Sequence, residues 1–541
     1  MANIANVLVA LSLVLIVILV IRHRRLSHRP SAPGPAGVPF FGVAWEIPSD
    51  KQWLKFHDWI ERYGDVVGIT VMGQPTLILG SAKAANDLLD ARGAIYSDRP
   101  NAVMAGELVG WDRGLGYAHG PDNPRFREFR RLFQQSIGSR ACLDPHILHM
   151  QEQETHRLML RMLRDPKNFY RHPRESTGAL ILRLAYGYEV AASSADAGTG
   201  DALVRAVEVA MQGFAKASEP GAFLVDNFPA LRHVPEWILR LSGSNFKAIA
   251  RQMRRELDEM YDLPFAFVKR QMAEGKAAPS FTLSYLEEKG NPSPADEELI
   301  KAAAASLYSG GADTTPSSMT AFILAMTLHP AIQVRAQAEL DTLLGASSSG
   351  EQQWARLPTF ADRAQLPYVS AVVLEVLRWN PAVPLGLAHR VTRDDLYRGY
   401  FVPQGTVVWA NIWSMLHDPE VFPEPERFMP ERYLQEDGTL RELERHEDPS
   451  VVGFGFGRRI CPGMFFAINS IFIGIAEMLY VFDITKSRDK GGHEIVPEVD
   501  FRGFIRAYLC LPRSHPVPFQ CVISPRCEEA AALIRRAAGE E

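Results

Sequence analysis

One continuous helical pattern, spanning residues 293–328, constrains the fold of this chain more than any other feature. It opens with Ser293-Pro294 and Asp296, which are typical of a helix start because serine caps the first turn and proline needs no N–H partner there. The pattern is roughly three times as long as the average helix of about 11–12 residues. A helix of this length is expected to cross an entire domain, so the sequence predicts a large body built around it.

Pro316 lies inside this long pattern. Proline has no N–H, and its ring clashes with the carbonyl group four residues earlier, here that of Ala312. We expect the helix to be kinked or widened over Ala312–Pro316, with a polar notch where water satisfies the freed carbonyl. The alternative is a helix that ends here and restarts, which the smooth apolar pattern of Met319–Leu328 disfavours.

The rest of the sequence predicts a mainly helical domain with a small β-rich part. The chain has 541 residues, of which 47% are hydrophobic, enough to bury one large core. Apolar and polar residues alternate over Val66–Leu79 around a Gly-Gln-Pro turn, which is typical of a β-hairpin. Strand-like stretches return at Arg390–Ala410 and Arg506–Ile523, and no repeat or linker divides the body.

Charge and cysteine content exclude some classes of protein. The formal net charge of -5 gives no reason to expect nucleic acid as a partner. The five cysteines are sparse and odd in number, which argues against a disulfide scaffold and for a reducing compartment. In such a compartment a single cysteine is available for chemistry.

The N-terminal residues predict a membrane anchor. Val7–Ile21 is apolar apart from one serine, and at about 1.5 Å per residue a helix of this stretch nearly matches a hydrocarbon core of roughly 27–30 Å. The basic cluster Arg22–Arg25 follows the apolar run, whereas a cleaved signal peptide carries its basic residues before it. We therefore predict a retained single-pass anchor, residues 1–25, in the endoplasmic reticulum membrane, with the rest of the chain in the cytosol.

The remaining chain divides into a hinge, a body and a tail. Residues 26–44 are rich in proline and glycine and are expected to form a stiff spacer that holds the body just off the membrane lipid. Residues 45–526 are expected to form the globular body. The acidic, alanine-rich residues 527–541 are expected to be a surface helix or a frayed end.

The strongest chemical signal is the glycine-rich segment Phe454-Gly-Phe-Gly-Arg-Arg459-Ile-Cys461-Pro-Gly463. Its glycines permit a tight loop, and Cys461 then enters an apolar helical run. Unpaired N–H groups and the dipole of a helix N-terminus stabilise a thiolate, and the adjacent arginines add positive charge. The alternative is a buried structural cysteine in a glycine turn, which is the usual role of a lone cysteine.

This segment resembles, position for position, the haem-binding loop of the cytochrome P450 superfamily, and the likeness covers roughly Pro33 to Arg526. The resemblance implies the superfamily fold with its long central helix. It also implies that Cys461 is the axial thiolate ligand of the iron in haem (iron protoporphyrin IX), that Arg459 pairs with a haem propionate, and that Phe454 belongs to the cofactor-binding loop. Parts of the C-terminal third look most like fungal microsomal members that oxidise secondary metabolites.

Glu375 and Arg378 are three residues apart on one helix face, and taken alone they indicate only a surface ion pair. A Pro-Glu-Arg-Phe motif containing Arg427 follows at the distance where the superfamily places a third partner. The resemblance therefore implies a buried network of Glu375, Arg378 and Arg427 that fixes the chain before the cysteine loop. Because such a network is costly unless fully paired, we expect it to serve folding rather than catalysis.

The middle of the long helical pattern carries Gly310-Gly311-Ala312-Asp313-Thr314-Thr315. Threonine and aspartate compete for backbone groups inside a helix, so taken alone they favour a polar patch that faces solvent. The segment is also similar to the oxygen-activation groove of the superfamily. That likeness implies that Thr314 assists dioxygen activation by a hydrogen bond, that Asp313 gates protons, and that Gly311 lets the haem approach the backbone.

Two further arginines are implied as propionate partners. Arg130 stands four residues after Phe126, as in a superfamily helix that usually carries tryptophan at the position of Phe126. The missing indole N–H weakens that contact or leaves it to another group. Arg390, in the sequence Ala388-His389-Arg390, is implied as a third partner.

The implied function is that of a haem-dependent monooxygenase, which inserts one oxygen atom from dioxygen into an apolar small molecule. Nothing in the sequence resembles a flavin or nicotinamide module, so electrons from NADPH are expected to come through a separate membrane-bound reductase. A haem-thiolate peroxygenase or isomerase is one alternative, disfavoured by the intact Asp313-Thr314 pair, and a membrane-anchored haem sensor is another. By the family pattern the substrate pocket is lined from Met104–Tyr117, Tyr308–Ala312, Ala382–Leu387 and Tyr508–Leu511.

Overall fold

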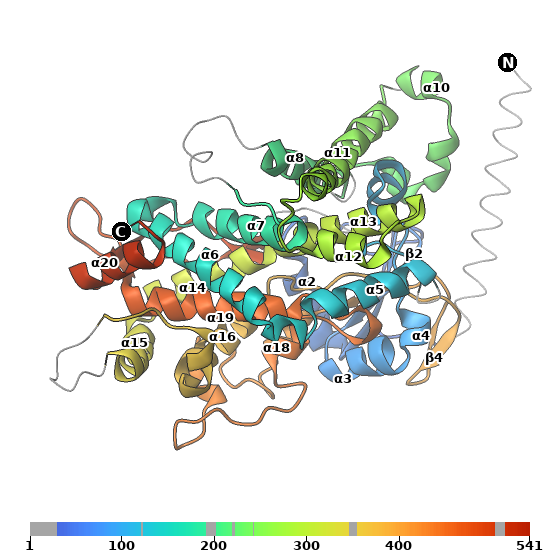
Figure 1. The fold of residues 1–541 in the computed structure, drawn as a ribbon. Helices are drawn as coiled ribbons and strands as arrows, with labels where there is room; N and C mark the ends of the chain where they lie inside the picture. Colours follow the sequence, from blue (N-terminus) through green and yellow to red (C-terminus); the bar gives the residue numbers. More distant parts are fainter. Residues whose placement is uncertain are drawn as a thin grey trace, which may run out of the picture.

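The computed structural model describes residues 30–120, 123–190, 202–218, 222–241, 243–345, 354–503 and 514–540, which form a mainly helical body with a small β-rich part (Figure 1). The longer helices are α5 (Pro124–Ile137), α6 (Pro145–Arg164), α7 (Arg171–Tyr186), α8 (Ala202–Ala217), α11 (Phe246–Ala273), α13 (Pro294–Gly311), α14 (Thr314–Leu328), α15 (Pro330–Leu344), α16 (Pro367–Trp379) and α19 (Met464–Val481). The shorter helices are α2 (Gln52–Tyr63), α3 (Ala82–Ala85), α4 (Gly93–Tyr96), α9 (Leu224–Asn227), α10 (Glu236–Leu241), α12 (Phe281–Lys289), α17 (Ile412–Leu416), α18 (Pro449–Val452) and α20 (Glu528–Ala537).

The main sheet joins early and late parts of the chain. β1 (Val66–Val71) and β2 (Gln74–Leu79) form the antiparallel hairpin that the alternating pattern predicts. β2 then pairs in parallel with β6 (Val407–Ala410), and β3 (His389–Arg390) completes the strand order β1-β2-β6-β3. The early hairpin is thus fixed to strands that are synthesised much later.

Small antiparallel pairs make up the rest of the β-rich part. They are β4 (Asp395–Tyr397) with β5 (Tyr400–Val402), β7 (Phe482–Lys486) with β10 (Cys521–Pro525), and β8 (Phe501–Gly503) with β9 (Ser514–Pro516). Strands β3 to β6 confirm the strand-rich stretch expected from residue 390 to 410. Of the second expected stretch, residues 506–513 lie outside the described residues, and β9 and β10 occupy the remainder.

The core is built around α14 and α19. Every residue of α14 from Thr315 to Thr327 is buried, and so is every residue of α19 from Ile471 to Val481. These helices pack on each other and on α16 across the middle of the molecule (Figure 1). In the described part of the chain, α19 is the one helix long and apolar enough to cross a membrane, and its burial makes it a core helix of the body.

The central helix is interrupted at Ala312 and Asp313. α13 ends at Gly311 and α14 begins at Thr314, so the expectation of one kinked helix was wrong, and the alternative of a helix that ends and restarts holds. Pro316 therefore occupies the third position of α14, in a first turn whose N–H groups have no intrahelical partner. The predicted start signal is confirmed, because Ser293 and Asp296 form a reciprocal capping box.

Both ends of the described chain are attached to the body. The carbonyl groups of Pro30 and Pro33 accept hydrogen bonds from the N–H groups of Phe401 and Gly68, at 2.7 and 2.8 Å. The proline-rich spacer, where described, therefore lies against β1 and β5. At the other end α20 buries its apolar face and packs on α6. The predicted membrane anchor, residues 1–25, lies outside the described residues.

Candidate active site

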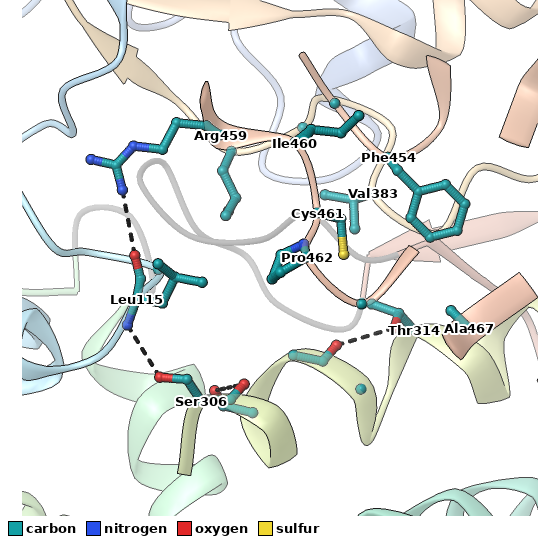
Figure 2. Close-up of a pocket in the computed structure, with 18 of the residues that line it drawn as sticks. Leu115, Ser306, Thr314, Val383, Phe454, Arg459, Ile460, Cys461, Pro462 and Ala467 are labelled. Atoms are coloured by element: carbon teal, nitrogen blue, oxygen red, sulfur yellow. Dashed lines mark hydrogen bonds between the residues drawn. The ribbon is translucent and has the colours of Figure 1, made fainter. Parts of the chain in front are cut away.

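The cysteine loop places Cys461 on the wall of an internal cavity, just before α19 (Figure 2). The chain turns at Gly457, whose φ of 55° is left-handed and where a Cβ atom would lie 2.1 Å from the carbonyl oxygen of Leu89. The N–H of Cys461 then donates to the carbonyl of Phe454 at 2.9 Å. The loop thereby turns the Cys461 sulfur toward the cavity, with Phe454 also on its wall.

The surroundings of the Cys461 thiol act on its ionisation in opposite directions. Burial raises the pKa of this thiol, while a backbone hydrogen bond with Gly463 and the positive charge of Arg130 act to lower it. The side chain lies deep inside the protein but is open to the cavity that it lines. A metal bound from the cavity side would stabilise the thiolate further.

The guanidinium groups of Arg99, Arg130 and Arg459 come together on the lining of the same cavity, and no carboxylate occurs among the described residues that line it. Burial lowers the pKa of all of them, that of Arg459 to about 10. Backbone carbonyl groups hold these side chains in place: Leu387 and Ala388 accept from Arg99 at 2.9 and 2.8 Å, Ile460 from Arg130 at 2.7 Å, and Ser97 from Arg459 at 2.7 Å.

These residues fit the haem that the sequence resemblance implies. Buried cations without anionic partners are unfavourable, and the two propionates of haem would supply the missing negative charge through strong hydrogen bonds to guanidinium groups. A cysteine thiolate is an established axial ligand for haem iron. The cavity lining combines the sulfur and these arginines with mostly apolar residues.

Phe126, which stands where the superfamily usually carries tryptophan, contacts one of the cavity arginines. The guanidinium carbon of Arg459 lies 4.0 Å from the centroid of the Phe126 ring, in a cation–π contact. Helix α5 therefore supplies both Arg130 and an aromatic surface for Arg459. Since stacking restricts the rotamers of a long side chain, Phe126 serves the site by orienting Arg459.

Arg390 does not line the cavity, contrary to expectation. Its Nε donates to Asp98 at 2.8 Å, and its Nη1 donates to Asn101 at 3.0 Å, so its charge is neutralised outside the site. The cavity is lined instead by His389, the preceding residue, and by Arg99, which is far from Arg390 in the sequence. The sequence gives no signal for Arg99, because an aspartate next to an arginine is common on protein surfaces. Only the fold directs Arg99 into the cavity and Asp98 toward Arg390.

Glu375 and Arg378 form a buried ion pair, since neither side chain has exposed surface. The two guanidinium nitrogens Nε and Nη2 of Arg378 donate to the carboxylate of Glu375 at 2.8 and 2.9 Å. The N–H of Met429 donates to the same carboxylate at 2.7 Å, and Nε of Arg432 lies 3.2 Å from its Oε2. The acid is thus surrounded by donors, as a buried charge requires.

The prediction that Arg427 supplies the third side chain of this network was wrong. Its guanidinium is 61% exposed and pairs with Glu424 at 3.4 Å, and only its backbone carbonyl accepts from Arg378. The chain carries a second Pro-Glu-Arg-aromatic motif five residues later, and a tight turn over Pro430–Tyr433 directs Arg432 back to Glu375. Both copies satisfy the sequence pattern, so only the fold distinguishes them.

The break between α13 and α14 carries the residues expected to activate dioxygen. Thr314 lines the cavity across from the cysteine loop, and its Oγ1 donates to the Gly310 carbonyl at 3.1 Å, bridging the break (Figure 2). Asp313 is not among the lining residues; its carboxylate lies 2.5 Å from Arg174 and 3.4 Å from His515. A Cβ atom at Gly311 would lie 2.5 Å from Ile181, so this glycine permits the close approach of α7.

The cavity lining agrees with the predicted pocket only in part. The central helix and the segment after α16 contribute as predicted, whereas in the first predicted range only the residues from Trp111 onward do so. The predicted segment Tyr508–Leu511 lies outside the described residues. Residues that sequence reasoning missed come from α7, α8 and α11, where an apolar helix face gives no signal that it borders a cavity: Thr177, Ile181, Leu184, Phe214 and Tyr261.

Comparisons with known proteins agree with this site. The family model described as Cytochrome P450 matches residues 32–502. The chain is 45% identical to Cytochrome P450 monooxygenase 208 of Postia placenta, over 97% of this chain and 96% of that protein. It is 42% identical to Cytochrome P450 monooxygenase claR of Ampulloclitocybe clavipes (93% and 88% covered) and 36% identical to Tryptamine 4-monooxygenase of Psilocybe cyanescens (94% and 95% covered). The chain therefore belongs to the cytochrome P450 family of monooxygenases, whose members bind haem.

Proposed function

We propose that this protein inserts one oxygen atom from dioxygen into a neutral, apolar small molecule of fungal secondary metabolism, using electrons that a separate reductase passes on from NADPH. The observation that carries the proposal is the position of Cys461 and Thr314 on facing walls of one cavity (Figure 2). The fungal relatives support the reaction type, since they are named as monooxygenases.

The charges around the cavity support a neutral substrate. Among the described residues that line the cavity, the charged side chains are arginines, and no carboxylate is available to pair with an ammonium group. Burying an ammonium group without an anionic partner is strongly unfavourable. A cationic amine is therefore a poor substrate, whereas the apolar lining from α7, α8 and α13 suits an uncharged ring or chain.

In this proposal Cys461 is the axial ligand, and Arg99, Arg130 and Arg459 hold the propionates. Bound haem supplies the redox chemistry of oxygen activation, which electron donation from a thiolate ligand favours. The backbone hydrogen bond from Cys461 to Phe454 fixes the loop that carries the sulfur. The apolar lining excludes water, so that protons reach the cavity only along placed polar groups.

Proton delivery is assigned to Thr314 and Asp313. Monooxygenation consumes protons as well as electrons, and a misplaced proton releases hydrogen peroxide instead of water. The Thr314 hydroxyl faces the cavity and can hold a hydrogen bond there, while Asp313 sits one residue earlier with its carboxylate outside the cavity, paired with the exposed Arg174. These positions suit an alcohol that orients the last proton and an acid that supplies it.

The test of the proposed function uses the full-length protein with an NADPH-dependent microsomal reductase. The spectrum of the reduced, carbon-monoxide-bound protein distinguishes thiolate-ligated haem from other haem sites. Binding spectra against terpenoid, polyketide and indole panels then identify substrates, and mass spectrometry follows oxygen-18 from dioxygen into the product. Product formation that needs only peroxide would favour the peroxygenase alternative, and spectra without turnover would favour a sensor.

For Thr314→Ala we expect NADPH oxidation to continue while the yield of product falls by about tenfold or more and hydrogen peroxide rises, since an acid–base contribution is worth about 10²–10⁴ in rate. The measurement is product and peroxide per NADPH oxidised. Thr314→Ser keeps a hydroxyl and should recover most of the coupling. Thr327→Ala is the matched control, because Thr327 makes the same hydroxyl-to-carbonyl bond at 2.8 Å near the far end of α14.

We also propose that residues 1–25 anchor the protein in the endoplasmic reticulum membrane, with residues 26–44 as the link, 45–526 as the catalytic body in the cytosol and 527–541 as a C-terminal tail. Deletion of residues 1–25 should move the protein from the membrane pellet to the supernatant. The haem content should stay unchanged, because the haem-binding residues all lie in the body. A truncated, unaggregated protein that still pellets fully with membranes would contradict a single anchor.

A further inference from the structure

Asp313 holds the position of a helix cap but does not act as one. Aspartate at the N-cap normally accepts a hydrogen bond from an N–H group of the first turn. The side chain of Asp313, at the N-cap of α14, makes no such bond. Part of the reason is Pro316, which occupies the third position of α14 and has no N–H to offer. The carboxylate is therefore directed to other partners.

These partners come from two different elements and bind the two carboxylate oxygens separately. Nη2 of Arg174, from α7, lies 2.5 Å from Oδ1 of Asp313. Nε2 of His515, from β9, lies 3.4 Å from Oδ2, within reach of an ion pair although off the line of a full hydrogen bond. The Arg174 side chain is 52% exposed, whereas that of His515 is only 11% exposed. One oxygen thus faces a solvated cation and the other an imidazole inside the protein.

The strand that carries His515 is fixed against the start of α14. The preceding residue, Ser514, donates its N–H to the Ala382 carbonyl at 2.9 Å and its hydroxyl to Asn380 at 2.6 Å. Its carbonyl accepts from the hydroxyl of Ser317, one residue after the proline of α14. Since Asn380, Ser317 and Ser514 are all buried, the position of His515 relative to Asp313 is set by a rigid polar cluster.

We propose that His515 is a positioning residue for oxygen activation, which together with Arg174 clamps the Asp313 carboxylate at the break of the central helix. The proposal rests on the role of Asp313 in the proposed function. A carboxylate held from both sides cannot rotate to cap α14 or to solvate fully. It stays one residue from Thr314, where it can take up a proton, pass the same proton on and return to its charged form.

The experiment measures hydrogen peroxide released per NADPH oxidised by the full-length, haem-loaded protein with reductase and without substrate. In this assay correctly delivered protons give water, and misdelivered protons give peroxide. We expect His515→Phe to raise the peroxide yield by only about two- to fivefold, because the contact that it removes is long, at 3.4 Å, and Asp313 keeps Arg174. His515→Gln keeps an N–H donor and should restore most of the wild-type ratio.

The pairing itself is tested without catalysis, by a double-mutant cycle on the thermal midpoint. If His515 acts through Asp313, the destabilisation in Asp313→Asn plus His515→Phe is smaller than the sum of the single effects. The rise in peroxide yield in the double variant should likewise be smaller than the sum of the rises in the two single variants. Should His515→Phe fail to fold, His515→Asn replaces it, because its shorter amide cannot reach Asp313.

His156→Phe is the matched control, since it removes a histidine 3.3 Å from the buried carboxylate of Glu477, and neither residue lines the cavity. Its peroxide yield should equal that of the wild type. If Asp313→Asn raises the yield and His515→Phe does not, or if the two are additive, the role of His515 is overturned while the proposed function stands. If Asp313→Asn itself leaves the yield unchanged, the proposed role of Asp313 fails, and the clamp fails with it.

Discussion

Cys461→Ser is expected to abolish turnover, with a loss of at least about a thousandfold, since the alcohol of serine cannot replace the electron donation of a thiolate. The reduced, carbon-monoxide-bound protein should lose the thiolate signature from its spectrum. Haem content, measured on the same preparation, separates loss of the ligand from loss of the cofactor. Retained monooxygenase activity in this variant would contradict the assignment of Cys461.

Cys527→Ser provides the control for this substitution. The sulfur of Cys527 accepts a hydrogen bond from the Ala530 N–H at 3.4 Å, at the N-cap of α20. Serine is a good N-cap residue, so it should keep that bond and leave both spectrum and activity unchanged. If both variants lose activity to a similar degree, the loss in Cys461→Ser could not be attributed to the cavity cysteine.

Glu375→Ala is expected to yield little haem-loaded protein. The substitution leaves Arg378 and Arg432 buried without their acid, and breaking a buried pair typically costs about 3–5 kcal/mol. This is a large part of the total stability of about 5–15 kcal/mol of an ordinary domain. The measurements are haem per polypeptide and the thermal midpoint, and wild-type values for both would show that the network does not support the fold.

Two further variants show which of the two Pro-Glu-Arg motifs supplies the partner of Glu375. Arg432→Ala should behave like Glu375→Ala, because Arg432 is only 6% exposed and contacts the buried acid. Arg427→Ala should change stability by less than about 1 kcal/mol, since its pair with Glu424 is solvated. The reverse order of the two effects would restore the sequence-based choice of Arg427.

The features predicted from the sequence are those that local chemistry determines. The capping box at Ser293, the hairpin around Gly73 and the loop before Cys461 each depend on residues that are close to one another in the sequence. In such segments the spacing of glycine, proline and apolar residues limits the backbone to few conformations. The mainly helical fold class follows from the same patterns and is confirmed.

The features that escaped prediction depend on distant contacts. Arg427 and Arg432 stand in equivalent motifs, and the choice between them is made by the position of Glu375. Arg390 was placed in the site because its sequence context gives no indication that Asp98 lies beside it. The helix break was misjudged because the pattern after Pro316 is compatible with a bend as well as with a new start, and the contacts of Asp313 were not visible in the sequence.

The contacts that join early and late parts of the chain, such as the pairing of β2 with β6, have a consequence for the order of folding during synthesis. Arg99 reaches its carbonyl partner across 288 residues of chain, and Arg459 reaches Ser97 across 362. Closing such loops is entropically costly and must await the arrival of the later partner from the ribosome. The hairpin and Arg99 can meet their partners once residues 387–410 have emerged, but Arg130, Arg459 and the thiolate come together only after Cys461 has followed. Cofactor capture is therefore among the last steps of folding, and truncated chains that end before α19 should bind no haem.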